Sequence, residues 1–179
     1  DCEVIVITAG IPRKPGMSRD DLLLTNAKIM QAVLEDIKKY APNSKIIIVS
    51  NPLDAMVYAA LKILKFPREH VIGMAGILDS ARMSHFICEK LGYGAGQIES
   101  SVMGGHGDAM VPLVNYSTVA GVSLPELLSK EDIEDIVTKT KNGGLQIVKL
   151  LETGSAYYAP AHATSLMVEA ILYNNKKNH

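Results

Sequence analysis

His106 stands in the glycine-rich run of residues 104–108, where small neighbours allow the backbone to approach a ligand closely. An imidazole in such a place can exchange a proton with a substrate near neutral pH. Asp108 is too near in sequence to be assumed its partner, and Asp79, at the start of an expected helix, is the better candidate. A carboxylate bonded to one ring nitrogen fixes the tautomer and leaves the other nitrogen for the substrate. The alternative is a loop histidine among turn glycines.

Arginines near this histidine in the expected fold suggest an anionic substrate. Arg82 lies three residues after Asp79, so the two share a helix face. Arg82 is either a forked clamp for a carboxylate or one half of an ordinary surface pair. Arg13 and Arg19 lie in a loop rich in Pro and Gly, which is either a mobile lid that brings cations to a substrate or a solvated basic loop.

Two strand exits add further candidates. Asn51 ends a buried strand, where its amide could donate to a substrate hydroxyl or carbonyl, or simply cap the following turn. Residues 8–10, Thr-Ala-Gly, offer small side chains and open backbone along which a nucleotide could lie. The alternative for them is a plain exit from strand to loop.

The first part of the chain alternates strands and helices. Strands are expected at residues 4–7, 45–50 and 71–73. Helices are expected from a capping box at Ser18 to before Pro42, and at residues 54–65. This βαβαβ order predicts an α/β fold with a doubly wound parallel sheet and right-handed crossovers. Because ligands bind beyond the carboxyl ends of such strands, Thr8–Gly10, Asn51 and Met74 should share one rim.

The second part changes character and suggests an attached α+β unit. A helix at 77–91, a strand at 98–103, an extended segment at 111–119 and a short helix from 123 are expected. A long helix at 129–151 is expected to be interrupted at Gly143-Gly144, and a last helix with Pro160 near its start to run through Ile171. We expect two domains, 1–73 and 74–179.

Composition narrows the class of protein. The 179 residues carry a net charge of −1, which gives no electrostatic reason to expect nucleic acid or an anionic membrane as a partner. No apolar run reaches the roughly 18 residues of a membrane span. Two cysteines are too few for a disulfide framework and favour the cytoplasm. The histidines show no zinc-ligand pairing, so we expect no metal, and a hydrolase that uses His and Asp with a metal is weakly supported.

The order and spacing of six runs give a more specific result than any single motif. They are residues 6–10, 13–19, 49–54, 78–82, 105–108 and 154–158. With these runs the chain resembles the lactate/malate dehydrogenase family. The resemblance implies the C-terminal half of a Rossmann-type sheet joined to part of an α+β catalytic domain, NAD as cofactor, and a homodimer or homotetramer.

The resemblance also implies roles for individual residues. His106 is similar to the general acid/base of the family, and Asp79 to the carboxylate that orients it. Arg82 resembles the residue that holds the substrate C1 carboxylate, and Arg19 the lid arginine that polarises the carbonyl. Asn51 resembles the residue that touches both substrate and nicotinamide. The residues similar to the family's cofactor-binding set are Thr8, Ala9, Gly10, Asn26, Val49, Asn51 and Met74.

Arg13 bears on the choice of substrate. Lactate-specific members commonly have Gln at this position and malate-specific members have Arg. A second carboxylate in a closed, water-poor site needs a compensating cation, which independently favours malate and oxaloacetate, and hence the tricarboxylic acid cycle. Lactate or another 2-hydroxy acid stays an alternative.

The sequence departs from the family in one respect. No G-x-G-x-x-G motif occurs, so we expect an incomplete chain, in which the segment that discriminates NAD from NADP is absent. A non-catalytic fragment or interaction module without the cofactor motif is the second alternative.

Overall fold

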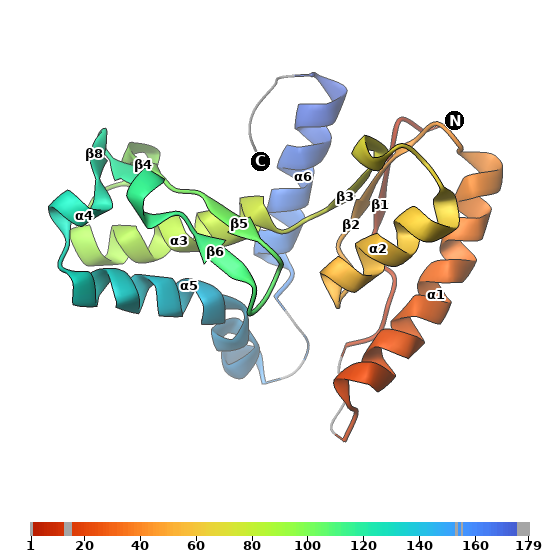
Figure 1. Cartoon of the computed structure of the whole chain (residues 1–179), viewed down its shortest axis with the longest axis horizontal. Helices are drawn as coiled ribbons and strands as arrows, with labels where there is room; N and C mark the ends of the chain where they lie inside the picture. Colours follow the sequence, from red (N-terminus) through yellow and green to blue (C-terminus); the bar gives the residue numbers. More distant parts are fainter. Residues whose placement is uncertain (1, 13–15, 153, 155, 175–179) are drawn as a thin grey trace. The chain divides into compact units, whose positions relative to one another are not determined.

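The computed structural model describes every residue except 1, 13–15, 153, 155 and 175–179. The chain forms two compact units (Figure 1). Unit 1 comprises Asp1–Met74 together with Tyr157–His179, and unit 2 comprises Ala75–Ala156. Each unit has its own sheet structure and helices, and each is described by itself below.

Unit 1 is built on a three-stranded parallel sheet in the order β1 (Val4–Ile7), β2 (Lys45–Ile48), β3 (Val71–Gly73). All three strands point the same way, which confirms the predicted parallel α/β arrangement. The three isoleucines of the central strand β2 are fully buried, whereas Val6 of the outer strand β1 is 39% exposed. Within the described chain β1 has a strand partner on one side, β2.

Three helices accompany this sheet. They are α1 (Arg19–Tyr40), α2 (Leu53–Leu64) and α6 (Tyr158–Leu172). The first two pack against each other, α2 also contacts β2 and β3, and α6 contacts β1. The predicted capping box is present, because the Ser18 Oγ accepts from the Asp21 N–H at 3.0 Å and the Asp21 carboxylate accepts from the Ser18 N–H at 3.0 Å. Within the described residues, the structure contains no helix with the length and hydropathy of a membrane span.

Unit 2 places three helices around short antiparallel strands. The helices are α3 (Gly76–Leu91), α4 (Leu124–Leu127) and α5 (Lys130–Leu151). One sheet has the order β4 (Ile98–Glu99), β7 (Thr118–Val119), β8 (Val122–Ser123), and a hairpin pairs β5 (Val102–Gly104) with β6 (Met110–Pro112). Its core residues are Met83, Phe86, Ile87, Ile98, Val102, Met110, Val119, Leu124 and Ile136. This core joins α3 and α5 to the hairpin that leads to His106.

Three local expectations in unit 2 need correction. The strand expected at 98–103 divides into β4 and β5, because Ser100 turns its hydroxyl to the Ser80 carbonyl oxygen at 2.8 Å instead of continuing the strand. The extended segment expected at 111–119 contains a 3₁₀ turn, Val114–Tyr116. Helix α5 runs without a break through Gly143-Gly144, where an interruption was expected.

Candidate active site

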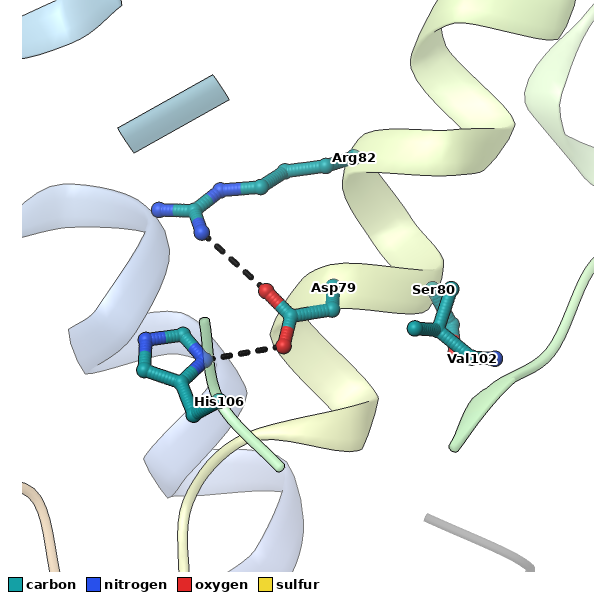
Figure 2. Close-up of polar contacts among 5 residues, drawn as sticks. All are labelled: Asp79, Ser80, Arg82, Val102 and His106. Atoms are coloured by element: carbon teal, nitrogen blue, oxygen red, sulfur yellow. Dashed lines mark hydrogen bonds and ion pairs between the residues drawn. The ribbon is translucent and has the colours of Figure 1, made fainter. Parts of the chain in front are cut away.

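Asp79 lies between Arg82 and His106 in unit 2 (Figure 2). Its Oδ2 accepts a hydrogen bond from His106 Nδ1 at 2.8 Å, and its Oδ1 accepts one from Arg82 Nη1 at 3.1 Å. The Asp79 side chain is 3% exposed, against 20% for His106 and 15% for Arg82. A nearly buried carboxylate is thus satisfied by two cationic or proton-bearing neighbours, which is the condition under which a buried charge is tolerated. The contact between Asp79 and His106 that the sequence predicted is present.

Helix α3 holds the two charged members of this group. Asp79 lies in the first turn of α3, where a negative side chain is favoured by the helix dipole, and Arg82 follows one turn later on the same face. The bond between them is therefore set by helix spacing. The histidine, by contrast, reaches Asp79 from a loop that must be placed by other contacts.

The loop between β5 and β6 carries His106. Gly104 at the end of β5 has φ +85°, and a Cβ there would meet the Ala109 carbonyl oxygen at 2.4 Å, so a glycine is required for the hairpin to close. The start of the hairpin is fixed to α3, because the Ser80 Oγ accepts from the Val102 N–H at 3.0 Å. Ser80 follows Asp79 directly, so the same helical turn holds both the carboxylate and the strand that leads to the imidazole.

A second set of predicted residues meets at the carboxyl ends of β1 and β2 in unit 1. Asn26 of α1 is 1% exposed and its amide is used by backbone groups. Its Oδ1 accepts from the Ile11 N–H at 2.8 Å, and its Nδ2 donates to the Ile11 and Asn51 carbonyl oxygens at 3.2 and 2.7 Å. The Ser50 Oγ adds a hydrogen bond to the Ala9 carbonyl oxygen at 2.5 Å. The two strand exits are therefore tied together through backbone.

The remaining predicted residues lie as follows. The register places the ends of β1, β2 and β3 at one edge, as the topology predicted, so Thr8–Gly10, Asn51 and Met74 follow that edge. Thr8, Gly10 and Asn51 are exposed, Ala9 and Val49 are half-buried, and Met74 is 4% exposed. Arg19 is the first residue of α1, and Arg13 lies outside the described residues.

Sequence reasoning did not assign Ser80 or the pair Gly143-Gly144 to the site. Ser80 gives no sequence signal, since one serine in a helix resembles any other. The two glycines lie against Arg82, and a glycine pair inside an otherwise helical pattern was the available signal. Among the residues that the structure describes, no group of three or more His, Cys, Asp or Glu side chains is placed to hold a metal ion.

Comparison with known proteins agrees with this geometry. The family model described as lactate/malate dehydrogenase, NAD binding domain, matches residues 1–73, and the model described as lactate/malate dehydrogenase, alpha/beta C-terminal domain, matches residues 77–178. The chain therefore belongs to the lactate/malate dehydrogenase family.

Individual relatives support the assignment to this family. The malate dehydrogenase of Aliarcobacter butzleri is 67% identical over 99% of this chain and 56% of its own length. The apo structure of malate dehydrogenase from Picrophilus torridus superposes with a TM-score of 0.94 at 49% identity, over 98% of this chain and 54% of that one. The lactate dehydrogenase of Eimeria maxima with NADH and oxamate gives 0.88 at 46%, over 95% and 53%. The chain thus spans about half the length of the relatives it matches.

Proposed function

We propose that this protein is an oxidoreductase that interconverts malate and oxaloacetate with NAD as cofactor. The observation that carries the proposal is the Asp79 carboxylate, which holds His106 at 2.8 Å and Arg82 at 3.1 Å on opposite oxygens. Such a group combines a proton-transfer residue with a carboxylate-binding cation. The malate dehydrogenases of the family, at up to 67% identity, support the choice of reaction.

The proton of the substrate hydroxyl passes to and from His106 in this proposal. Asp79 accepts from Nδ1, so the ring keeps the tautomer in which Nε2 exchanges the proton with the substrate. When the ring becomes an imidazolium, the same carboxylate stabilises its charge. Because Asp79 is almost fully buried, water competes little for this hydrogen bond.

Arginines and one amide position the substrate. Arg82 holds the C1 carboxylate, because a guanidinium can present two parallel N–H donors to a carboxylate where an ammonium cannot. Arg19 polarises the carbonyl, an electrostatic contribution that is largest when water is excluded. Asn51 contacts the substrate and the nicotinamide end. Arg13 binds the distal carboxylate and so selects a dicarboxylate.

The strand-exit edge of unit 1 fits the dinucleotide of the family. Gly10 is exposed with φ +151°, and a Cβ there would meet the Asn26 amide at 3.1 Å, so the backbone at the end of β1 stays bare. The residues proposed to hold the cofactor are Thr8, Ala9, Gly10, Asn26, Val49, Asn51 and Met74. When bound there, the nicotinamide supplies or takes up the hydride. For Asn26 the contacts in the structure add a second role, since its amide also fixes the backbone of residues 11 and 51.

The chain's organisation, compartment and assembly belong to the same proposal. We propose residues 1–73 as the second half of the dinucleotide-binding domain and 74–179 as the catalytic domain, on the support of the two family models. The low cysteine content favours the cytoplasm.

A homodimer or homotetramer suits the exposed apolar side chains of α5, such as Leu145 at 62% and Leu150 at 84% exposure. A monomeric mass in light scattering would contradict that assembly.

The substrate assignment is tested by replacing Arg13 with Gln in the full-length protein. NADH oxidation would be followed in steady state with oxaloacetate and with pyruvate. We expect the wild type to prefer oxaloacetate, and Arg13→Gln to shift the ratio of kcat/KM values toward pyruvate by roughly 10- to 100-fold, as loss of a charge-assisted hydrogen-bond pair requires. Arg68→Gln, at an exposed arginine of the 3₁₀ turn Arg68–His70, is the matched control. An unchanged ratio in Arg13→Gln contradicts the assignment.

A second candidate is a lactate dehydrogenase or other 2-hydroxy acid dehydrogenase. The 46% identity to the lactate dehydrogenase of Eimeria maxima favours keeping it. A wild-type preference for pyruvate over oxaloacetate would select this candidate. A third possibility is a protein that retains the fold without the activity, and titration of NADH fluorescence separates it from both enzymes, since it predicts no binding.

A further inference from the structure

Helix α5 contains two adjacent glycines, Gly143 and Gly144, in a continuous helix that ends at Leu151. A glycine inside a helix costs about 0.5–1 kcal/mol relative to alanine, because more conformational freedom is lost on folding. Gly143 is buried and Gly144 half-buried. Two such residues in succession therefore indicate that something occupies the space of their missing side chains.

Arg82 of α3 lies closest to that space, tighter than ordinary contact for a Cβ on Gly143 and in ordinary van der Waals contact with one on Gly144. A Cβ on Gly143 would meet the Arg82 Cδ at 3.2 Å and Nε at 3.6 Å. A Cβ on Gly144 would meet Nη2 at 3.4 Å and Nη1 at 3.7 Å. For both glycines the three nearest atoms all belong to Arg82, so the side chain lies along the bare surface of α5 from its stem to its guanidinium.

This arrangement differs from ordinary close packing of two helices. In that case the nearest atoms to the missing Cβ would be backbone or several side chains of the facing helix. Here the three nearest atoms to each missing Cβ belong to a single cationic side chain. Arg82 is therefore the side chain that a substitution at either glycine would displace first.

Arg82 itself is held by few hydrogen bonds. Within the described chain Asp79 is its one hydrogen-bond partner, through Nη1, and its Nε is buried with none. A guanidinium has five N–H donors, so most of its hydrogen-bonding capacity is not used by the protein. Packing against Gly143 and Gly144, together with the ion pair to Asp79, is what fixes the plane of the group.

We propose that Gly143 and Gly144 are positioning residues that set the plane of the Arg82 guanidinium for the substrate carboxylate. The proposal rests on the proposed function of Arg82. A bidentate pair requires that both N–H donors face both carboxylate oxygens, so a tilt or shift of a few tenths of an ångström weakens it. The glycines add no contact to the substrate and act through Arg82.

The test compares Gly143→Ala and Gly144→Ala with Asn142→Ala in the full-length protein. Asn142 is exposed on the same helix and its amide donates to the Thr138 carbonyl oxygen of α5 itself, so its replacement raises helix propensity at an exposed position of the same helix. For Gly143→Ala we expect a melting temperature that is unchanged or higher, and a KM for both oxaloacetate and pyruvate that rises by about tenfold. Gly144→Ala, with a looser contact, should show a smaller rise in KM. The dissociation constant of oxamate, measured by quenching of NADH fluorescence, should rise with KM.

A double-mutant cycle with Arg82→Lys isolates the pair. If the glycines act through the guanidinium, Gly143→Ala should raise KM little further in the Arg82→Lys background, because the group it displaces is gone. A KM within twofold of the Asn142→Ala value, or equal effects in both backgrounds, overturns the proposal, and so does a fall in melting temperature in both glycine variants. Should Gly143→Ala fail to fold, Gly144→Ala decides by the same criteria. An inactive wild type would instead refute the proposed function, so the two failures are distinguishable.

Discussion

The groups proposed for chemistry in unit 2 and those proposed for cofactor binding in unit 1 are held in different ways. In unit 2, charged side chains hold one another directly, with Asp79 bonded to both Arg82 and His106. In unit 1, the buried amide of Asn26 and the hydroxyl of Ser50 bond to backbone oxygens and an N–H at the strand exits.

This difference follows from what each region has to recognise. A proton and a carboxylate require side chains with charge and titration, which must be paired when they are buried. A long nucleotide lying along the sheet edge requires accessible backbone in a fixed shape, which small residues and internal hydrogen bonds provide. Substitution of the chemical groups of unit 2 should therefore change rate with little effect on stability, and substitution of the strand-exit groups of unit 1 should change stability and cofactor affinity together.

The largest effect is expected from His106→Asn. Removal of the proton-transfer group should lower kcat by roughly 10²- to 10⁴-fold, the usual contribution of a general acid or base. The melting temperature should change little, because Asp79 keeps Arg82 as a partner. Steady-state oxaloacetate reduction and thermal unfolding would be measured on the same samples.

His85→Asn provides the matched control for this variant. His85 lies on α3 with a side chain that is 65% exposed, a long contact to Glu89 at 3.8 Å and a tilted ring contact with Phe86. Its replacement should leave kcat unchanged. A His106→Asn enzyme with wild-type kcat would remove His106 from the proposed mechanism, whatever the stability shows.

Asn26→Ala should give the second largest effect. Here we expect a loss of stability and of cofactor affinity, in contrast to the loss of kcat expected for His106→Asn. It leaves the Ile11 N–H and the Ile11 and Asn51 carbonyl oxygens without their partner, at a cost of about 1–3 kcal/mol in the free energy of unfolding. Urea denaturation measures this cost, and NADH fluorescence should show weaker binding because the strand exits are no longer tied together.

Gln31→Ala is the control on the same helix. Gln31 is exposed and its amide bonds to the nearby Glu35 at 2.9 Å, so replacing it should change the free energy of unfolding by far less. If Asn26→Ala is as stable as Gln31→Ala and binds NADH like the wild type, the hydrogen bonds of Asn26 to the backbone contribute neither to stability nor to cofactor binding. The proposed difference between the two regions would then be wrong for unit 1.

The fold of unit 1 was predictable because local signals agreed with the tertiary structure. The capping box at Ser18 and Asp21, the buried strand β2 and the βαβαβ order each led to the observed element. In unit 2 the strands are two or three residues long, and side-chain bonds decide where they break. The Ser100 hydroxyl donates to the Ser80 carbonyl oxygen, 20 residues away in the sequence. The local pattern of apolar residues does not predict a contact between positions so far apart.

The candidate site divides in the same manner. The bond between Asp79 and Arg82 follows from helix spacing, and the choice of Asp79 for His106 followed from rejecting a partner too close in sequence. The hydrogen bonds of Asn26 to backbone groups were not predictable, since an asparagine within a helical pattern does not indicate which groups its amide will bond. Gly143 and Gly144 were wrongly interpreted as an interruption of the helix, because helix propensity alone does not reveal that Arg82 lies against them.

The smallest effect is expected from Ser18→Ala, at the N-cap of α1. Loss of an N-cap costs about 1 kcal/mol at neutral pH. The hydrogen bonds from the Ser18 side chain and backbone hold the pKa of the Asp21 carboxyl below its ordinary value. A lowered folded-state pKa stabilises the protein above the unfolded pKa, about 4, and that contribution is lost as the pH falls through the folded value. The difference in unfolding free energy between wild type and variant should therefore be constant near neutral pH and shrink below about pH 4.

Ser129→Ala completes the comparison, because Ser129 caps α5 in unit 2 through the Asp132 N–H at 3.2 Å. Both variants should lose a similar stability at pH 7, measured by urea denaturation. Only Ser18 immediately precedes Arg19, the first residue of α1 and the proposed lid arginine, so only Ser18→Ala should also lower kcat/KM for oxaloacetate. Equal kcat/KM in the two variants would mean that the start of α1 does not position Arg19, and the role of Arg19 would then depend on the loop alone.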